Sequence, residues 1–147
     1  MTTSHARRAL EARVIRFYEE LWNEWRLELV EELLSPEVAF RGSLGTEVRA
    51  REGFVAYAQM VRAAFPDFHN EVRELVIDGD RAAALLECSG THHGPIFGVA
   101  GTGRTIRYQG AAFFRFDEHG RILTAWVLGD LVTLLKQLGV KRLPPVG

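Results

Sequence analysis

The fold is decided by the stretch from residue 75 to residue 85, which reads Leu75-Val76-Ile77-Asp78-Gly79-Asp80-Arg81-Ala82-Ala83-Ala84-Leu85. Asp-Gly between two apolar runs is the strongest short-range signal of a β-hairpin, because the favoured tight turns need positive φ angles. A second turn, Asp117-Glu118-His119-Gly120, lies between two further apolar runs. We therefore predict long antiparallel strands over residues 68–77, 81–92, 105–116 and 122–130.

The first half of the chain has helical periodicity instead. Leu10, Val14, Phe17 and Leu21 recur three or four residues apart and predict an amphipathic helix over residues 4–24. The pattern further predicts a short second helix ending at Ser35-Pro36, a strand at 38–41, a helix over 51–65 and a last helix over 131–138. Helices followed by hairpins indicate an α+β fold with helices on one face of a bent antiparallel sheet. A doubly wound parallel fold would need helices between the later strands.

Composition narrows the class of protein further. A chain of 147 residues with 47% hydrophobic and 25% charged residues suits a single domain, here residues 1–147 with a core at about 14–139. A net charge of −1 favours no nucleic-acid partner. The single cysteine, Cys88, suits a reducing compartment, and no apolar stretch has the length of a signal peptide or membrane span. We expect a cytoplasmic protein without a membrane partner.

Asp130 is the strongest candidate for chemistry. By strict alternation along residues 122–130 it shares a face with Ile122, Trp126 and Leu128. A carboxylate among apolar side chains loses hydration, which raises its pKa and suits it to act as a general acid or base near neutral pH. The alternative is that Asp130 only caps the last helix, since Asp is a preferred N-cap. Both roles are compatible, and the sequence does not separate them.

Tyr108 is a possible partner of this carboxylate. If Phe116 pairs with Ile122 across the turn, the same register brings Tyr108 opposite Asp130. A slip of one residue would exchange Tyr108 for Arg107 and turn Phe113 and Arg115 inward. Both registers stay open at this stage.

His92 and His93 end a predicted strand, so their rings point to opposite faces. One ring could serve the pocket as an acid, a base or a hydrogen-bond donor, and His92 is our second catalytic candidate. A structural histidine is the more common outcome for either ring. A metal site is not predicted, because adjacent strand histidines share a metal poorly and no acidic or thiol cluster accompanies them.

Most of the aromatic side chains belong to the core, but a cone-shaped sheet encloses more volume than its own side chains fill, and we expect this surplus volume to form an apolar pocket. The predicted substrate-binding residues are Tyr18, Trp22, Phe40, Phe54, Tyr57, Phe65, Tyr108, Phe114 and Trp126. The glycine-rich loop at 94–103 follows neither a phosphate-loop nor a dinucleotide-binding spacing, and no serine-nucleophile motif occurs.

A chain-wide set of short motifs resembles the SnoaL-like polyketide cyclases of the nuclear-transport-factor-2-like and ketosteroid-isomerase-like superfamily. Its carriers are Leu21-Trp22-Asn23, Leu33-Leu34-Ser35-Pro36-Glu37-Val38, Ala64-Phe65-Pro66-Asp67-Phe68, Asp78-Gly79-Asp80-Arg81, Gly90-Thr91-His92-His93-Gly94, Thr102-Gly103-Arg104, Phe114-Arg115-Phe116, Gly120-Arg121-Ile122, the segment from Trp126 to Asp130, and Leu134-Leu135-Lys136-Gln137-Leu138-Gly139. Phe40-Arg41-Gly42 departs from the family, which often has a histidine or another polar residue there. His93 stands where a threonine is common.

The resemblance implies a curved sheet wrapped around the N-terminal helices, a cystatin-like α+β barrel shaped as a cone with an internal pocket. It also implies a homodimer formed through the outer sheet face. Characterised relatives close polyketide rings by intramolecular aldol condensation without metal or organic cofactor, with an acidic residue at the position of Asp130 acting as general acid and base.

Two other functions remain open from the sequence. One is epoxide hydrolysis in the same cone, which favours an Asp-Arg-Asp arrangement that we cannot place. The other is a non-catalytic protein that binds a small apolar ligand or serves as a dimerisation module. The discriminating feature is whether Asp130 points into the cavity beside a second polar group.

Overall fold

A computed structural model describes residues 4–141 of the chain. The helices are α1 (Ser4–Arg16), the π-helix η1 (Phe17–Trp22), the short 3-10 helix η2 (Leu27–Leu29), α2 (Val30–Leu33), α3 (Ala50–Ala64) and α4 (Leu131–Gln137). The strands are β1 (Leu34–Arg41), β2 (Glu47–Arg49), β3 (His69–Asp78), β4 (Arg81–Thr91), β5 (Thr105–Phe116) and β6 (Ile122–Gly129). The predicted α+β class is confirmed.

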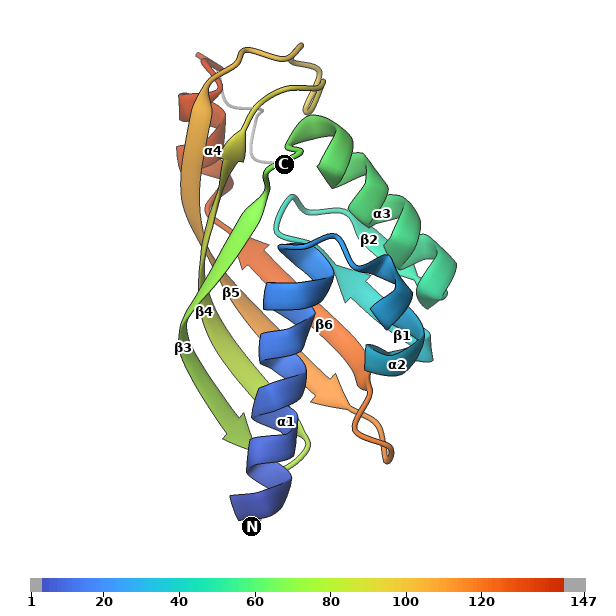
Figure 1. Cartoon of the computed structure of the whole chain (residues 1–147). Coiled ribbons are helices and arrows are strands. Elements are labelled where there is room, and N and C mark those ends of the chain that lie inside the picture. Colours follow the sequence, from blue (N-terminus) through green and yellow to red (C-terminus); the bar gives the residue numbers. More distant parts are fainter. Residues whose placement is uncertain (1–3, 142–147) are drawn as a thin grey trace, which may run out of the picture.

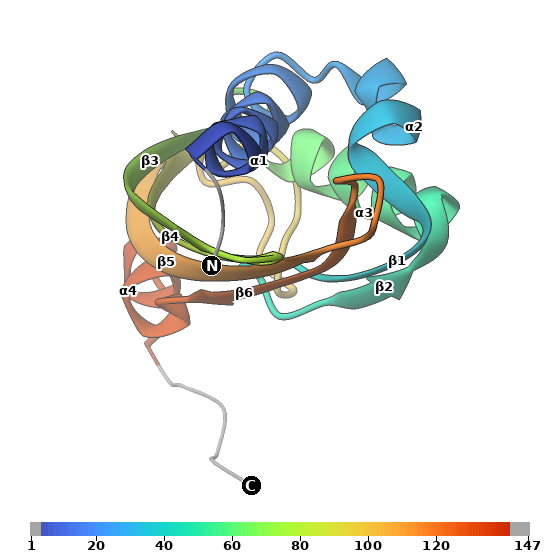
Figure 2. The same cartoon turned by 90° about the horizontal axis from the view of Figure 1, so that it is seen from below.

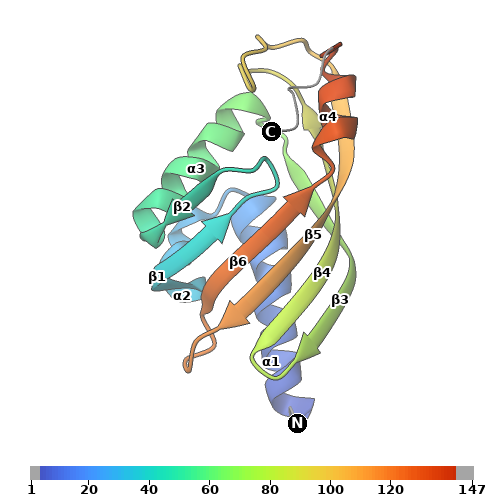
Figure 3. The same cartoon turned by 180° about the vertical axis from the view of Figure 1, so that it is seen from behind.

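The strands form one curved sheet in the order β2-β1-β6-β5-β4-β3. Helices α1, α2 and α3 lie on its concave side, whereas α4 lies against the opposite side (Figures 1 and 2). Seen from behind, the convex face of the sheet is open apart from α4 (Figure 3). The helices within residues 4–141 are all too short or too polar to span a bilayer.

The predicted hairpins are present. Strands β3 and β4 meet at Asp78 and Arg81, and Gly79 adopts a φ of 62° in the turn between them. Strands β4 and β5 then pair without interruption from Arg81 opposite Arg115 to Thr91 opposite Thr105. Buried residues alternate strictly with exposed or half-buried ones along β4 and β5, because one face of these strands packs on the core and the other meets solvent.

The sheet is mixed rather than purely antiparallel. Strand β1 runs parallel to β6, with Phe40 opposite Ala125 and Arg41 opposite Trp126. Strand β2, which the sequence pattern did not predict, pairs with β1 at the sheet edge. It has only three residues, so its apolar periodicity is too short to recognise.

A β-bulge at the start of β6 decides which residues face the core. Phe116 pairs with Ile122 as predicted, but the next β5 residue, Arg115, pairs with Thr124, so Leu123 is an extra residue. The extra residue reverses the alternation along the rest of the strand. Ala125 and Val127 therefore face the core, and Trp126 and Leu128 are exposed.

The predicted first helix changes its winding within the expected range. It is α-helical to Arg16 and then becomes a π-helix from Phe17 to Trp22. Four of the six π-helical residues are buried, namely Phe17, Tyr18, Leu21 and Trp22. The wider turn brings both adjacent pairs onto the inner face of the helix.

Candidate functional site

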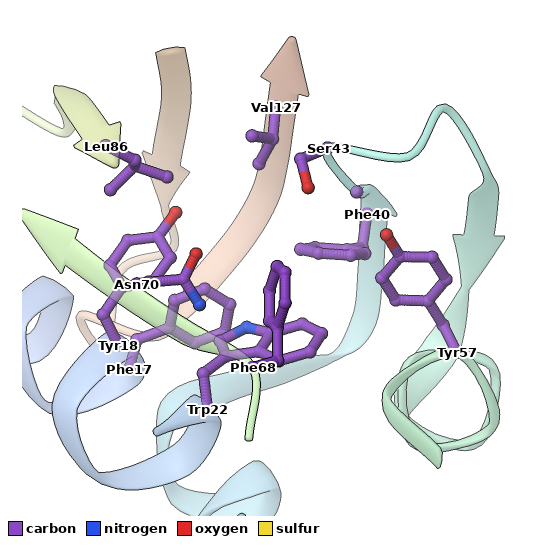
Figure 4. A pocket seen from close by; sticks show the side chains of 11 residues that line it. Phe17, Tyr18, Trp22, Phe40, Ser43, Tyr57, Phe68, Asn70, Leu86 and Val127 are labelled. Atoms are coloured by element: carbon purple, nitrogen blue, oxygen red, sulfur yellow. The ribbon is translucent and has the colours of Figure 1, made fainter. Parts of the chain in front are cut away.

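A small cavity lies between the π-helix η1 and the concave face of the sheet. It is lined by Phe17, Tyr18, Trp22, Phe40, Gly42, Ser43, Tyr57, Phe68, Asn70, Leu86 and Val127. Figure 4 shows these side chains arriving from η1, β1 and the loop after it, α3, β3, β4 and β6. The cavity has a volume of about 20 Å³, which is room for about one water molecule.

Aromatic rings fill most of the space that the curved sheet encloses. Trp22 packs against Phe40 at a centroid distance of 6.3 Å and against Tyr57 at 6.0 Å. Phe40 and Tyr57 themselves lie 5.4 Å apart. The surplus volume expected from the sequence is therefore small in this conformation, and a substrate of several carbon atoms enters only when lining side chains move.

The Tyr18 hydroxyl is the notable polar group of this cavity. Tyr18 is 3% exposed, and its hydroxyl has no hydrogen-bond partner within the described part of the chain. Burial, with a smaller effect of the nearby Cys88, raises the pKa of Tyr18 well above the ordinary value. The phenol thus keeps its proton at neutral pH and can donate it to an oxygen atom placed in the cavity.

The other polar groups around the cavity bond to one another. Ser43 Oγ lies 2.7 Å from the Tyr108 hydroxyl, and the two hydroxyls share a hydrogen bond. The Cys88 thiol donates to Asn70 Oδ1 at 3.3 Å. The Tyr18 hydroxyl belongs to neither pair.

Cys88 serves here as a buried hydrogen-bonding group. Desolvation raises the pKa of the Cys88 thiol to about 12. A thiol with so high a pKa carries almost no thiolate at neutral pH and is a poor nucleophile.

Asp130 lies outside the cavity, so the predicted apolar environment of this carboxylate is wrong. Its side chain is exposed and accepts hydrogen bonds from the Thr133 hydroxyl at 2.6 Å and the Thr133 N–H at 3.2 Å. These bonds, the hydroxyl first, lower its pKa rather than raise it. The bulge at Leu123 is the cause, since it turns Trp126, Leu128 and Asp130 away from the core. The N-cap alternative describes what is observed.

The same bulge separates Asp130 from Tyr108. Asp130 donates its N–H to the Gln109 carbonyl at 2.9 Å, so it lies opposite Gln109. Tyr108 faces inward and is 2% exposed, while Arg107 and Phe113 face outward. Of the two registers that the sequence left open, the structure therefore has the one in which Tyr108, rather than Arg107, faces the core.

His92 is buried and His93 is exposed, which settles the question of the two rings. His92 Nδ1 accepts the Thr102 N–H at 3.2 Å, which leaves Nε2 as the other polar atom of the ring. That Nε2 has no hydrogen-bond partner among residues 4–141. The ring packs on Phe65 at 5.7 Å and does not line the cavity, so the structure gives it no access to a ligand there.

The predicted substrate-binding residues divide into three groups. Tyr18, Trp22, Phe40 and Tyr57 line the cavity. Phe54, Phe65 and Phe114 are buried in the core behind it, as is Tyr108, which reaches the cavity through Ser43. The expected inward position of Trp126 is wrong, because this ring is 41% exposed on the outer face with the Arg41 guanidinium 5.8 Å from it.

Sequence reasoning missed two polar lining residues. Ser43 lies in the loop after β1, where its orientation depends on how that loop folds over Tyr57 and Tyr108. Asn70 is 5% exposed at the start of β3. A polar residue at an inward position of a strand is a recognisable signal, but the faces of β3 could not be assigned before its register was known.

The lining residues contain hydroxyl, amide and aromatic groups, and they include no Asp, Glu, Arg or His. The Asp-Arg-Asp set that epoxide hydrolysis needs is therefore not found around this cavity. Within residues 4–141 no group of three or more His, Cys, Asp or Glu side chains could hold a metal ion. The arrangement can bind an apolar molecule and donate a hydrogen bond to one of its oxygen atoms.

Comparisons with known proteins agree with this fold. The family model described as SnoaL-like polyketide cyclase matches residues 12–138. The crystal structure of IdmH from Streptomyces antibioticus, provisionally called a polyketide cyclase, is 33% identical and has a TM-score of 0.76, over 89% of this chain and 99% of that one. A protein from Jannaschia sp. CCS1, provisionally called a SnoaL-like polyketide cyclase, is 18% identical with a TM-score of 0.85 and covers 99% of each chain. A search of curated proteins finds no match.

Proposed function

Because the chain belongs to the SnoaL-like polyketide cyclase family, we propose that it binds a small apolar carbonyl compound in the cavity beside Tyr18 and promotes its intramolecular aldol cyclisation without a cofactor. The observation that carries the proposal is the buried Tyr18 hydroxyl, which has no partner within residues 4–141 and borders an aromatic-lined cavity. A buried donor without a partner costs free energy, about 1–3 kcal/mol. A ligand oxygen would remove that cost.

The aromatic walls supply the first contribution to catalysis. Trp22, Phe40 and Phe68 would hold a flexible chain of carbonyl groups in a folded conformation in which the reacting carbons meet. Fixing two reacting groups in contact removes much of the entropic barrier of the cyclisation.

Tyr18 supplies the second contribution. Its phenol would donate a hydrogen bond to the carbonyl oxygen that becomes an enolate oxygen, where negative charge develops in the transition state. A proton on a carbon next to that carbonyl passes to water. The enolate carbon then attacks the second carbonyl carbon, and the new alkoxide takes a proton back from water. Tyr18 keeps its own proton throughout, as its raised pKa requires.

The experiment uses diacetylacetone, a linear triketone that closes to orcinol by aldol condensation and loss of water. We expect the wild-type protein to accelerate this reaction and Tyr18→Phe to lower the rate about a hundredfold, the usual effect of removing one oxyanion donor. Asp130→Asn is the matched control and should keep full activity, because Asp130 lies outside the cavity. Full activity in Tyr18→Phe together with loss in Asp130→Asn would contradict the proposal.

A second candidate is a protein that binds such a ligand without converting it. No carboxylate or imidazole lies among the cavity-lining residues, which favours ligand binding without conversion over acid–base catalysis by a side chain. It predicts that diacetylacetone or orcinol binds the wild-type protein, and binds Tyr18→Phe more weakly, while the rate of ring closure stays at its value in buffer.

A further inference from the structure

The helix that carries Tyr18 changes from α to π winding where the cavity begins. Arg16 still has α-helical angles, with φ −63° and ψ −37°, and η1 starts at the next residue. A π turn contains one more residue than an α turn, so it is less stable alone and persists where its surroundings hold it. What holds this turn therefore decides where the Tyr18 hydroxyl points.

Asn23 closes the π turn through its backbone. Its N–H donates to the Tyr18 carbonyl, five residues earlier, at 2.9 Å. After Asn23 the backbone hydrogen bonds again join residues four apart, as in an α-helix. The Glu24 N–H donates to the Glu20 carbonyl at 3.2 Å. The Asn23 N–H is shared with the Glu20 carbonyl, and its 2.9 Å bond ends directly on the residue that bears the cavity hydroxyl.

The side chain of Asn23 fixes the same point to the sheet. Its Nδ2 donates to the Asn70 carbonyl at 2.9 Å, and its Oδ1 accepts the Asn70 N–H at 2.8 Å. The carboxamide thereby occupies both free backbone groups of Asn70 on β3, which is an edge strand of the sheet. Asn70 lines the cavity, and its Oδ1 accepts from Cys88.

Resting on the function proposed above, we infer that Asn23 is a positioning residue, which sets the Tyr18 hydroxyl and the Asn70 amide in fixed relation at the two sides of the ligand site. Figure 4 shows the polar ends of both side chains directed to the same space. Without the Asn23 side chain, η1 loses its two bonds to β3 and can return to α winding. That change rotates Tyr18 relative to the sheet and takes its hydroxyl away from the cavity.

The test follows the tyrosines directly. The protein has three of them, so fluorotyrosine labelling gives three fluorine NMR signals, and Tyr18→Phe assigns the one from Tyr18. In Asn23→Ala we expect the Tyr18 signal to shift and broaden more than those of Tyr57 and Tyr108. Asn23→Asp keeps the acceptor for the Asn70 N–H, so its Tyr18 signal should lie nearer the wild-type position.

The control is Asp117→Ala, which removes side-chain bonds to the backbone of His119 and Arg121 at the distant β5–β6 turn. It should lower stability as well but leave the Tyr18 signal in place. Equal shifts of all three signals in Asn23→Ala, or an unmoved Tyr18 signal, would overturn the inference.

Kinetics give a second readout. If the wild-type protein converts diacetylacetone, Asn23→Ala should lose roughly tenfold in rate, the equivalent of one neutral hydrogen bond. Unchanged turnover in that variant would overturn the inference. If the wild-type protein neither converts nor binds the triketone, the proposed function fails, whereas the fluorine signals still decide the role of Asn23 because they require no substrate.

Discussion

At the residue scale, the environment of a side chain decides its chemistry more than its type does. Tyr18 is buried and its hydroxyl has no partner within residues 4–141, so this hydroxyl can bond to a ligand. Asp130 is exposed and bonded to Thr133, so its carboxylate stays ionised and caps α4. Sequence reasoning placed Asp130 first and named Tyr18 only as a substrate-binding aromatic, because it could not foresee the extra residue in β6 that turns Asp130 away from the cavity.

Asp67 gives a pH-dependent prediction at this scale. Burial acts to raise the pKa of Asp67, but hydrogen bonds from the Thr91 N–H at 2.7 Å and its hydroxyl at 2.8 Å outweigh it, and the pKa lies below the ordinary value of 3.8. A carboxyl with a lowered folded pKa stabilises the protein in full above its unfolded pKa, and the effect disappears as pH falls through the folded pKa.

We therefore expect the free energy of unfolding to decrease below about pH 4, and to decrease less steeply in Asp67→Asn. Urea unfolding of both proteins across this range measures the difference. If the free energy of unfolding falls with pH equally steeply in both proteins, the Asp67–Thr91 contact does not contribute to the loss of stability in acid.

At the element scale, long periodic elements were predictable and short or irregular ones were not. The hairpin at Gly79, strand β5 and helix α3 all lie within a residue or two of their predicted bounds. The π-helix, the bulge at Leu123 and the three-residue strand β2 were missed. Each depends on contacts with distant parts of the chain, which local propensity does not contain.

The loop after β1 offers a test of how tightly these elements pack. A Cβ atom at Gly42 would lie 1.9 Å from the Tyr57 hydroxyl on α3, so no side chain fits there without movement. We expect Gly42→Ala to lower the free energy of unfolding by about 1–3 kcal/mol, as overpacking of a close contact does. Thermal or urea unfolding measures this, and wild-type stability in the variant would show that the loop adjusts freely.

At the scale of the whole molecule, the order of helices and strands indicated the layers of the fold, and the family resemblance added that the sheet curves around the N-terminal helices. Helix and strand order predicted helices on one face of a bent sheet. The structure has α1, α2 and α3 there, but α4 lies on the opposite face (Figure 2). The size of the internal cavity could not be foreseen, because it depends on how the buried aromatic rings interlock. Their centroid distances of about 5–6.5 Å leave little free volume.

The convex face of the sheet leads us to propose that the protein forms a homodimer, as the family resemblance implies. Val76, Phe113, Trp126 and Leu128 are between 41% and 62% exposed on this face. An apolar face of this kind commonly marks an interface. Sedimentation velocity should give the mass of a dimer for the wild-type protein and of a monomer for Phe113→Glu.

Met60→Glu is the control for that measurement, because Met60 is an exposed apolar residue on α3, away from the convex face. It should leave the dimer intact. A monomeric wild-type protein, or dissociation of both variants alike, would contradict the proposed interface.

The central claim, that the Tyr18 hydroxyl serves a ligand rather than the fold, is tested most directly by the free energy of unfolding of Tyr18→Phe in urea without ligand. Removing a buried hydroxyl that has no partner in the described part of the chain should make the protein more stable, by about 1 kcal/mol, since its desolvation cost disappears. The account predicts that gain together with the loss of activity or binding described above. A variant that is less stable than the wild type would show that the hydroxyl holds the fold together, and would contradict the account.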